Sequence, residues 1–127
     1  QPQVGATFDD LITTELKEQK VDNEISYFCR ITPQMTNHLG TVSYGVLMTI
    51  VTETARKALR KIKKGDLVVE NVTFYYIKPV QIDSDIELIP RVLEVSRKFG
   101  KVDVEIHHDG KIVGKAMMMA QLLDHRS

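Results

Sequence analysis

The feature that most constrains the fold of this chain is an apolar stripe at helical spacing between residues 46 and 62. Its members recur at intervals of one, three and four residues: Val46, Leu47, Ile50, Val51, Thr54, Ala55, Ala58, Leu59 and Ile62. This spacing predicts one amphipathic helix of roughly five turns. Ser43 stands at the expected N-cap and Gly65 at the expected C-terminal cap. Because a helix with one apolar face needs a partner surface, a sheet must cover this stripe.

The rest of the chain is dominated by predicted strands. Segments rich in β-branched and aromatic residues cover 24–31, 67–77, 86–95, 102–107 and 112–123. Short turns join the last four strands, so these strands must be mostly antiparallel. Residues 8–17 predict a short helix capped by Thr7, which the polar stretch up to Glu24 ends. The predicted fold class is α+β, with a curved antiparallel sheet wrapped around one long central helix.

Three local signals refine the predicted strands. Asp109-Gly110 predicts a tight hairpin turn. Pro90 predicts a bulge or an edge position. In the run Met117-Met118-Met119, strand alternation places Met118 on one face and its two neighbours on the other. Apolar side chains on both faces, with the pair Tyr75-Tyr76, predict an oligomer.

Composition excludes several functions. Lys and Arg together number 17, as do Asp and Glu, so the formal charge is zero and nucleic-acid binding is disfavoured. No apolar run reaches the roughly 20 residues that cross a bilayer, so no membrane partner is expected. Cys29 is the single cysteine, which favours a reducing compartment, most simply the cytoplasm. The four histidines show no metal-ligand spacing, so no metal site is expected.

Asn37, Gly40, Gly45 and the helix that follows (GTVSYGVLMTIVTETARKAL) resemble the signature of hot-dog-fold acyl-CoA thioesterases. Segments 69–82 and 91–123 resemble the later strands of that family. In particular, the chain resembles the C-terminal hot-dog domain of bacterial regulatory proteins with DRTGG and CBS domains. It is also similar to the malonyl-CoA-sensing domain of the fatty-acid synthesis repressor. We therefore expect a linker and short helix over 1–23, a hot-dog domain over 24–124 and a tail over 125–127. The start at Gln1 without Met indicates an excised domain or a processed chain.

The resemblance implies a homodimer or tetramer that binds CoA thioesters between subunits, with no further cofactor. It places the thioester carbonyl at the start of the central helix. The substrate-binding residues carried over there are Gly40, Ser43, Tyr44, Gly45 and Tyr76. It also places the CoA phosphates at the turn that holds Arg97, Lys98 and Lys101. The alternatives are an N-cap role for Ser43 and a solvated hairpin tip for the three cations.

The catalytic residues of the family carry over poorly. The common pattern opens the helix with His-Gly-Gly, where this chain has Ser43, Tyr44 and Gly45. At the position of the catalytic acid in that pattern, this chain has Thr52. A second pattern, that of the fluoroacetyl-CoA thioesterase group, has a Thr, an acid eight residues later and a His on the following strand. The corresponding positions here are Gly45, Glu53 and Tyr76, and only Glu53 matches.

The catalytic candidates are therefore Glu53 as a general base and Asn37 as a residue that orients water or the thioester. The alternatives are a Glu53–Lys57 ion pair and a turn-capping role for Asn37. His38, beside Asn37, is either a base or a solvated loop residue.

Three functions follow from these departures. The first is an acyl-CoA-binding sensor or regulatory module of a larger CBS-domain-type protein, with weak or no hydrolysis. The second is an active acyl-CoA thioesterase that uses Glu53. The third is a dimerisation module that binds no ligand.

Overall fold

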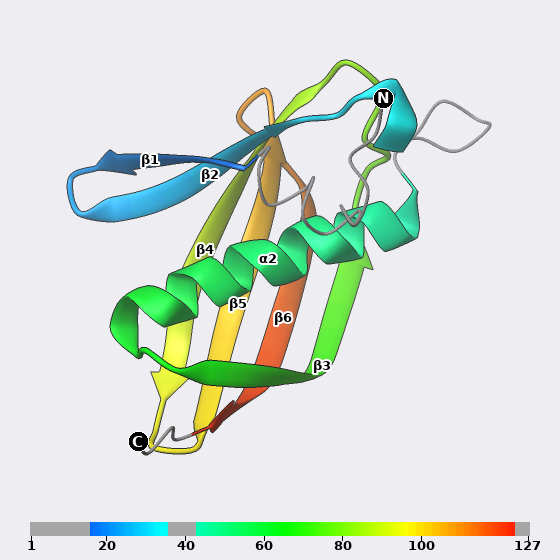
Figure 1. Ribbon diagram of the computed structural model, residues 1–127. Coiled ribbons are helices and arrows are strands. Elements are labelled where there is room, and N and C mark those ends of the chain that lie inside the picture. The colour runs from blue at the N-terminus through cyan, green and yellow to red at the C-terminus, as the bar shows by residue number, and fades with distance from the viewer. Residues whose placement is uncertain (1–15, 36–42, 124–127) are drawn as a thin grey trace, which may run out of the picture.

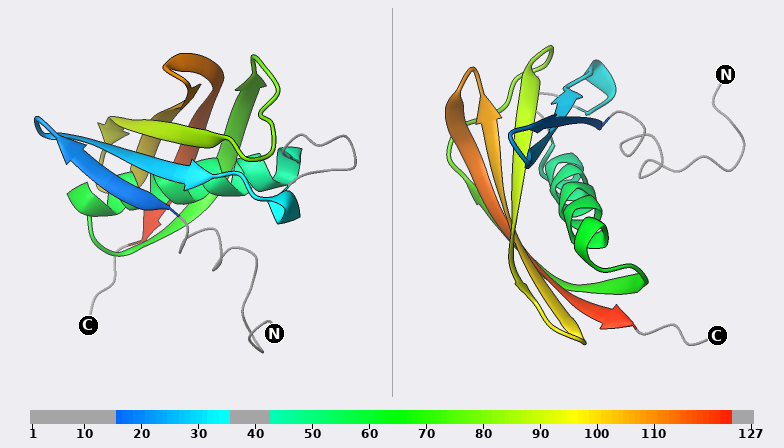
Figure 2. Two further views of the ribbon diagram at one scale, coloured as in Figure 1. Left: turned by 90° about the horizontal axis from the view of Figure 1, so that it is seen from above. Right: turned by 90° about the vertical axis from the view of Figure 1, so that its left-hand side faces the viewer.

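The computed structural model describes residues 16–35 and 43–123, which form one six-stranded antiparallel sheet and one long helix. The elements are β1 (Lys17–Val21), β2 (Glu24–Arg30), a 3₁₀ turn η1 (Pro33–Met35), α2 (Tyr44–Ile62), β3 (Asp66–Tyr76), β4 (Asp85–Val95), β5 (Phe99–His108) and β6 (Lys111–Leu123). The strand order is β1-β2-β4-β5-β6-β3. The sheet curves around α2, as Figures 1 and 2 show. The predicted fold is confirmed.

The central helix begins where its cap predicts. The Ser43 hydroxyl oxygen accepts a hydrogen bond from the Val46 amide at 3.3 Å. At the other end, the Lys63 amide donates to the Leu59 carbonyl. Gly65 follows with a φ of +121°, a conformation that glycine adopts without strain. The N-cap prediction is confirmed, but the C-cap is Lys63 and Gly65 lies two residues beyond it. The helix starts two residues before the apolar stripe.

The core lies between α2 and the concave face of the sheet. Its largest helix and strand members are completely buried, among them Leu47, Ile50, Leu59, Leu88, Ile106 and Met118. The helix comes close to the sheet at Gly100, where an added Cβ would lie 2.6 Å from a Leu59 methyl carbon. Thr54 is buried in the stripe, and its hydroxyl donates to the Ile50 carbonyl at 2.9 Å. Small residues at these two points therefore let the helix and the sheet approach each other closely.

The N-terminal part of the prediction is wrong at one point. Most of the helix predicted over 8–17, with its Thr7 cap, lies outside the described residues, but Lys17 begins strand β1. The polar stretch after it is not a helix end but one arm of a hairpin. Asp22 and Asn23 form the turn with φ values of 51° and 68°, the left-handed conformation that tight hairpins require.

This β1–β2 hairpin leaves the sheet on the side of α2 and passes over the C-terminal half of the helix (Figures 1 and 2). The pairing of β2 with β4 runs from Arg30↔Asp85 to Tyr27↔Leu88 and stops there. Pro90 lies two residues further along β4 and has no N–H to offer a neighbouring strand. Its predicted edge character is therefore confirmed, and a bulge follows between Val92 and Glu94.

The remaining local predictions agree with the structure. Asp109 and Gly110 have φ values of 52° and 75° in the β5–β6 turn. Met118 is fully buried against the helix side, whereas Met117 and Met119 are half-buried on the outer face. Within the described residues no helix is long and apolar enough to span a bilayer.

Candidate functional site

The start of α2 lies beside the end of β3, and this junction forms the candidate site. The Ser43 amide donates to the Met35 carbonyl at 3.0 Å, which fixes the chain as it enters the helix. The first amides of any α-helix have no acceptor within the helix, and the helix dipole adds positive potential there. Gly45 is exposed, and a Cβ added to it would meet no atom within 4 Å. The surface above this turn is therefore open to a carbonyl or an oxyanion.

Three aromatic rings border this opening. The Tyr44 ring meets Phe74 edge to face, with ring centroids 5.3 Å apart, and Phe74 stacks on Tyr76 at 5.6 Å. The Tyr44 hydroxyl donates to the Phe74 carbonyl at 3.4 Å, and the Tyr76 hydroxyl accepts from the Val80 amide at 3.2 Å. Tyr44 and Tyr76 remain 49% and 41% exposed, so they present an apolar surface next to the helix start. The sequence indicated both tyrosines but missed Phe74, which strand alternation places on the face of Tyr76.

Glu53 does not lie at the helix start. It is eight residues beyond Gly45, about 12 Å further along the axis. Its carboxylate lies 3.6 Å from Arg56 Nε, and its side chain is 22% exposed. This ion pair joins Glu53 to Arg56, three residues further along the helix. Thr52, at the position of the common catalytic acid, donates its hydroxyl to the Met48 carbonyl at 2.7 Å.

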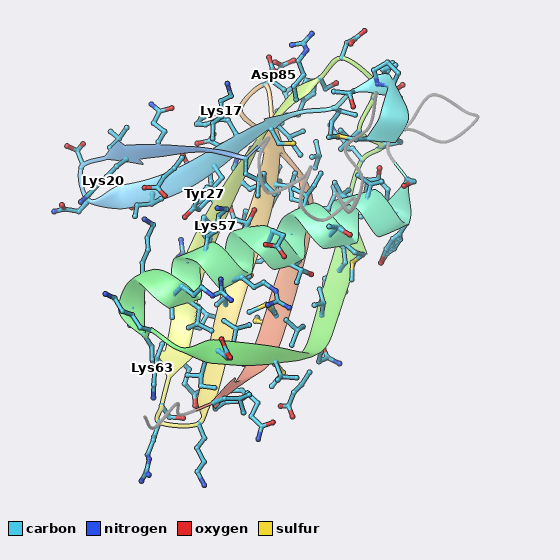
Figure 3. The ribbon with its side chains drawn as sticks, in the orientation of Figure 1. Lys17, Lys20, Tyr27, Lys57, Lys63 and Asp85 are labelled. Carbon is cyan, nitrogen blue, oxygen red and sulfur yellow. The ribbon has the colours of Figure 1, made fainter. Side chains whose placement is uncertain are left out.

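The three cations lie at the opposite end of the helix, Arg97 and Lys98 in the β4–β5 turn and Lys101 in β5 itself, because the turn ends before Phe99 rather than at Lys101. Lys63, just after α2, donates its ammonium to the Arg97 carbonyl at 2.7 Å and so joins the helix end to this turn. In Figure 3 Lys63 lies at the end of the molecule away from the helix start. Because α2 has 19 residues, roughly 28 Å separate its two ends. A single chain therefore unites Ser43, Tyr44, Gly45 and Tyr76 but keeps Arg97, Lys98 and Lys101 apart from them.

Asn37, His38 and Gly40 lie outside the described residues. Among residues 16–35 and 43–123, no three His, Cys, Asp or Glu side chains gather closely enough to hold a metal ion. His107 Nε2 lies 2.9 Å from Glu105 Oε1 on the outer face of the sheet, and this contact holds the pKa of Glu105 below its usual value. His108 instead contacts the Asp85 carbonyl at 3.1 Å, so the two adjacent histidines have separate partners.

Comparison with known proteins agrees with this fold. A family model described as the thioesterase superfamily matches residues 39–115. Uncharacterized protein YtoI of Bacillus subtilis (strain 168) is 51% identical over 126 residues, which are 98% of this chain and 29% of that protein. The chain thus spans less than a third of the length of this curated relative.

Solved structures are similar at low identity. Zebra fish thioesterase superfamily member 2 has a TM-score of 0.83 at 18% identity, over 94% of this chain and 90% of that chain. A hypothetical thioesterase from Streptococcus pneumoniae TIGR4, solved with coenzyme A, has a TM-score of 0.78 at 21% identity, over 94% and 95%. The smu.793 protein of Streptococcus mutans UA159, bound to acetyl CoA, has a TM-score of 0.75 at 17% identity, over 88% and 91%. All three share the fold of this chain.

Proposed function

The chain belongs to the thioesterase superfamily, and from this membership and the open helix start we propose that it binds an acyl-CoA. The thioester carbonyl accepts hydrogen bonds from the amides at Tyr44 and Gly45, where the helix dipole favours negative charge. The rings of Tyr44 and Tyr76 contact the apolar part of the ligand. The observation that carries this proposal is the empty space above Gly45. The CoA-bound solved structures of the same fold support the ligand class.

The same proposal requires two copies of the chain. Strand β3 forms one edge of the sheet, and Val68, Tyr75, Tyr76 and Ile77 on and just after it are exposed. An exposed apolar edge strand is a template for pairing with another strand. When the β3 strands of two copies pair about a two-fold axis, the strands of the second sheet run in the opposite direction to those of the first. The β4–β5 turn of the second copy then lies at the same end of the dimer as the helix start of the first copy. We propose a homodimer, or a tetramer of such dimers, in which Arg97, Lys98 and Lys101 of one copy hold the CoA phosphates for the other.

We further propose a sensing or regulatory role with weak or no hydrolysis. Glu53, the candidate base, lies about 12 Å along the helix from Gly45 and pairs with Arg56. The structure of the chain therefore brings no carboxylate of α2 to the helix start. The chain matches 29% of a longer relative, which accords with a ligand-binding module of a larger protein of the CBS- and DRTGG-domain type. A cytoplasmic location belongs to the same proposal and rests on Cys29 being the single cysteine of the sequence.

One experiment separates this role from its two rivals. The purified chain is mixed with CoA thioesters from acetyl and malonyl to palmitoyl, and thermal stabilisation and free thiol are followed together. A ligand that binds only the folded state raises the midpoint by mass action. Stabilisation without thiol release supports the sensor. Thiol release that disappears in Glu53→Gln, but persists in a matched Glu70→Gln control, supports the thioesterase instead. No stabilisation by any thioester leaves dimerisation as the function and overturns the proposal.

A further inference from the structure

The β4–β5 turn, residues 96–98, is fixed at both of its ends by main-chain hydrogen bonds. The Ser96 amide donates to the Phe99 carbonyl at 2.8 Å, and the Ser96 hydroxyl donates to the same oxygen at 3.4 Å. On the β6 side, the Leu122 amide donates to the Lys98 carbonyl at 2.9 Å. The side chains of Arg97 and Lys98 are exposed. The turn therefore presents two cations on a short loop with anchored ends.

The middle of this turn is held by a lysine from the end of α2. The Lys63 ammonium donates to the Arg97 carbonyl at 2.7 Å and lies 3.5 Å from the Ser96 carbonyl. Figure 3 shows the Lys63 side chain running from the helix end toward the turn. A carbonyl oxygen carries partial negative charge and would repel a phosphate beside it. An ammonium engaged with these oxygens offsets that charge and holds the main chain of the turn in place.

The end of α2 is a firm support for this contact. Lys63 is also the C-cap, and its amide donates to the Leu59 carbonyl at 2.9 Å. The Leu59 side chain is fully buried and packs against Gly100, just beyond the turn, where an added Cβ would lie 2.6 Å from a Leu59 methyl carbon. A cation is also favoured at this end of the helix by the helix dipole. The main chain of Lys63 thus closes the helix, and its side chain ties the helix to the turn.

We propose that Lys63 is a positioning residue for the CoA phosphates, because it holds the turn in the shape that presents Arg97 and Lys98. The inference rests on the proposed function, in which this turn binds those phosphates. A loop that is ordered before the ligand arrives loses less conformational entropy on binding, so its affinity is higher. Lys63 therefore contributes to the selection of CoA thioesters over thioesters that lack the nucleotide.

The binding test compares acetyl-CoA with S-acetylpantetheine, which carries the same thioester and no phosphate. Both are titrated into the whole chain and followed by NMR at about 0.15 M salt, where exposed charges are screened. Lys63→Met removes the ammonium and keeps an aliphatic side chain, so the Kd of acetyl-CoA should rise about threefold to tenfold. The Kd of S-acetylpantetheine should not change.

Two further variants separate position from charge. Lys63→Arg offers several N–H donors to the same carbonyls and should restore the affinity for acetyl-CoA. Lys64→Met removes the same charge from the exposed neighbouring residue and is the matched control. Because that charge is screened at this salt concentration, its loss should change the Kd of acetyl-CoA less than about twofold.

A second measurement, made without ligand, reports on the turn itself. The Ser96 amide closes the turn, so its hydrogen exchange should become about threefold faster or more in Lys63→Met. The Leu47 amide, which donates to the Ser43 carbonyl at the far end of the helix, should exchange at the wild-type rate. Lys63→Arg and Lys64→Met should leave both rates unchanged.

The outcomes distinguish this role from the proposed function. An unchanged Kd of acetyl-CoA in Lys63→Met, or an equal loss of both thioesters, overturns the role of Lys63 and leaves acyl-CoA binding standing. Unchanged exchange of the Ser96 amide overturns positioning even where the affinity for acetyl-CoA falls, because Lys63 would then contact the phosphates directly. A wild type that binds neither thioester overturns the proposed function, and the role of Lys63 falls with it.

Discussion

At the scale of single residues, a substitution at Gly45 distinguishes a role of this glycine in folding from a role in ligand binding. No neighbouring atom requires a glycine there, and alanine is the better helix former. Gly45→Ala should therefore leave the thermal midpoint unchanged or slightly raised. The same methyl group would block the approach of a thioester carbonyl, so the acyl-CoA Kd should rise at least tenfold. Calorimetric titration measures the second effect, and an unchanged Kd would show that the carbonyl binds elsewhere.

Tyr27 predicts how stability depends on alkaline pH. Its pKa is about 12 in the folded protein and roughly 10 in an unfolded chain. The neutral phenol is thus favoured by folding, and this contribution is complete below pH 10 and lost as the pH rises toward 12. Urea unfolding at pH 9, 10.5 and 11.5 should show a steeper loss of stability in the wild type than in Tyr27→Phe. Below pH 9 the contribution of this phenol is constant, so the difference in stability between the two proteins should not change with pH there. Parallel curves for the two proteins would contradict this account.

At the scale of elements, the start of α2 depends on its cap. Ser43→Ala removes the acceptor of the Val46 amide and should lower the free energy of unfolding by about 1 kcal/mol. Ser43→Asp restores an acceptor and adds a charge that suits the helix dipole, so it should recover the loss. Chemical denaturation measures both variants. Equal stability of Ser43→Ala and the wild type would show that the cap contributes little.

The elements also show what the sequence could predict. The stripe from Val46 to Ile62 specified α2, because burial of one helix face leaves a 3.6-residue period. Strand β1 left no such pattern, since all five of its residues are exposed. Its signal was the turn at Asp22 and Asn23. The separation of Gly45 from Lys98 by the length of α2 was also beyond sequence reasoning, because it depends on which end of the helix meets which turn.

The place where β2 parts from β4 was missed for a related reason. The pairing of the two strands ends at Tyr27↔Leu88, and no local sequence pattern records where two strands part. Pro90 was the one available signal, because a residue without an N–H marks a place where pairing can end. Buried positions could be predicted from periodicity, whereas the point at which two paired strands separate could not.

At the scale of the whole molecule, the exposed edge strand predicts the mode of association. Val68 and Tyr75 on β3 are 47% and 65% exposed. Charged residues on an edge strand oppose pairing, so Val68→Lys with Tyr75→Lys should convert a dimer into a monomer in light scattering. Leu93→Lys, on β4 and 46% exposed, is the matched control and should remain dimeric. A monomeric wild type, or a dimeric double variant, would contradict association through β3.

The most direct measurement tests whether each acyl-CoA site combines two copies. Gly45→Asp disables the helix start, and Arg97→Glu with Lys98→Glu disables the phosphate turn, so neither variant alone should bind acetyl-CoA in a calorimetric titration. After the two variants are mixed in equal amounts and allowed to exchange subunits, half of the dimers are mixed, and each carries one intact site. We predict that binding of wild-type affinity returns at about a quarter of the sites. No recovery after proven exchange would contradict a site shared between two copies.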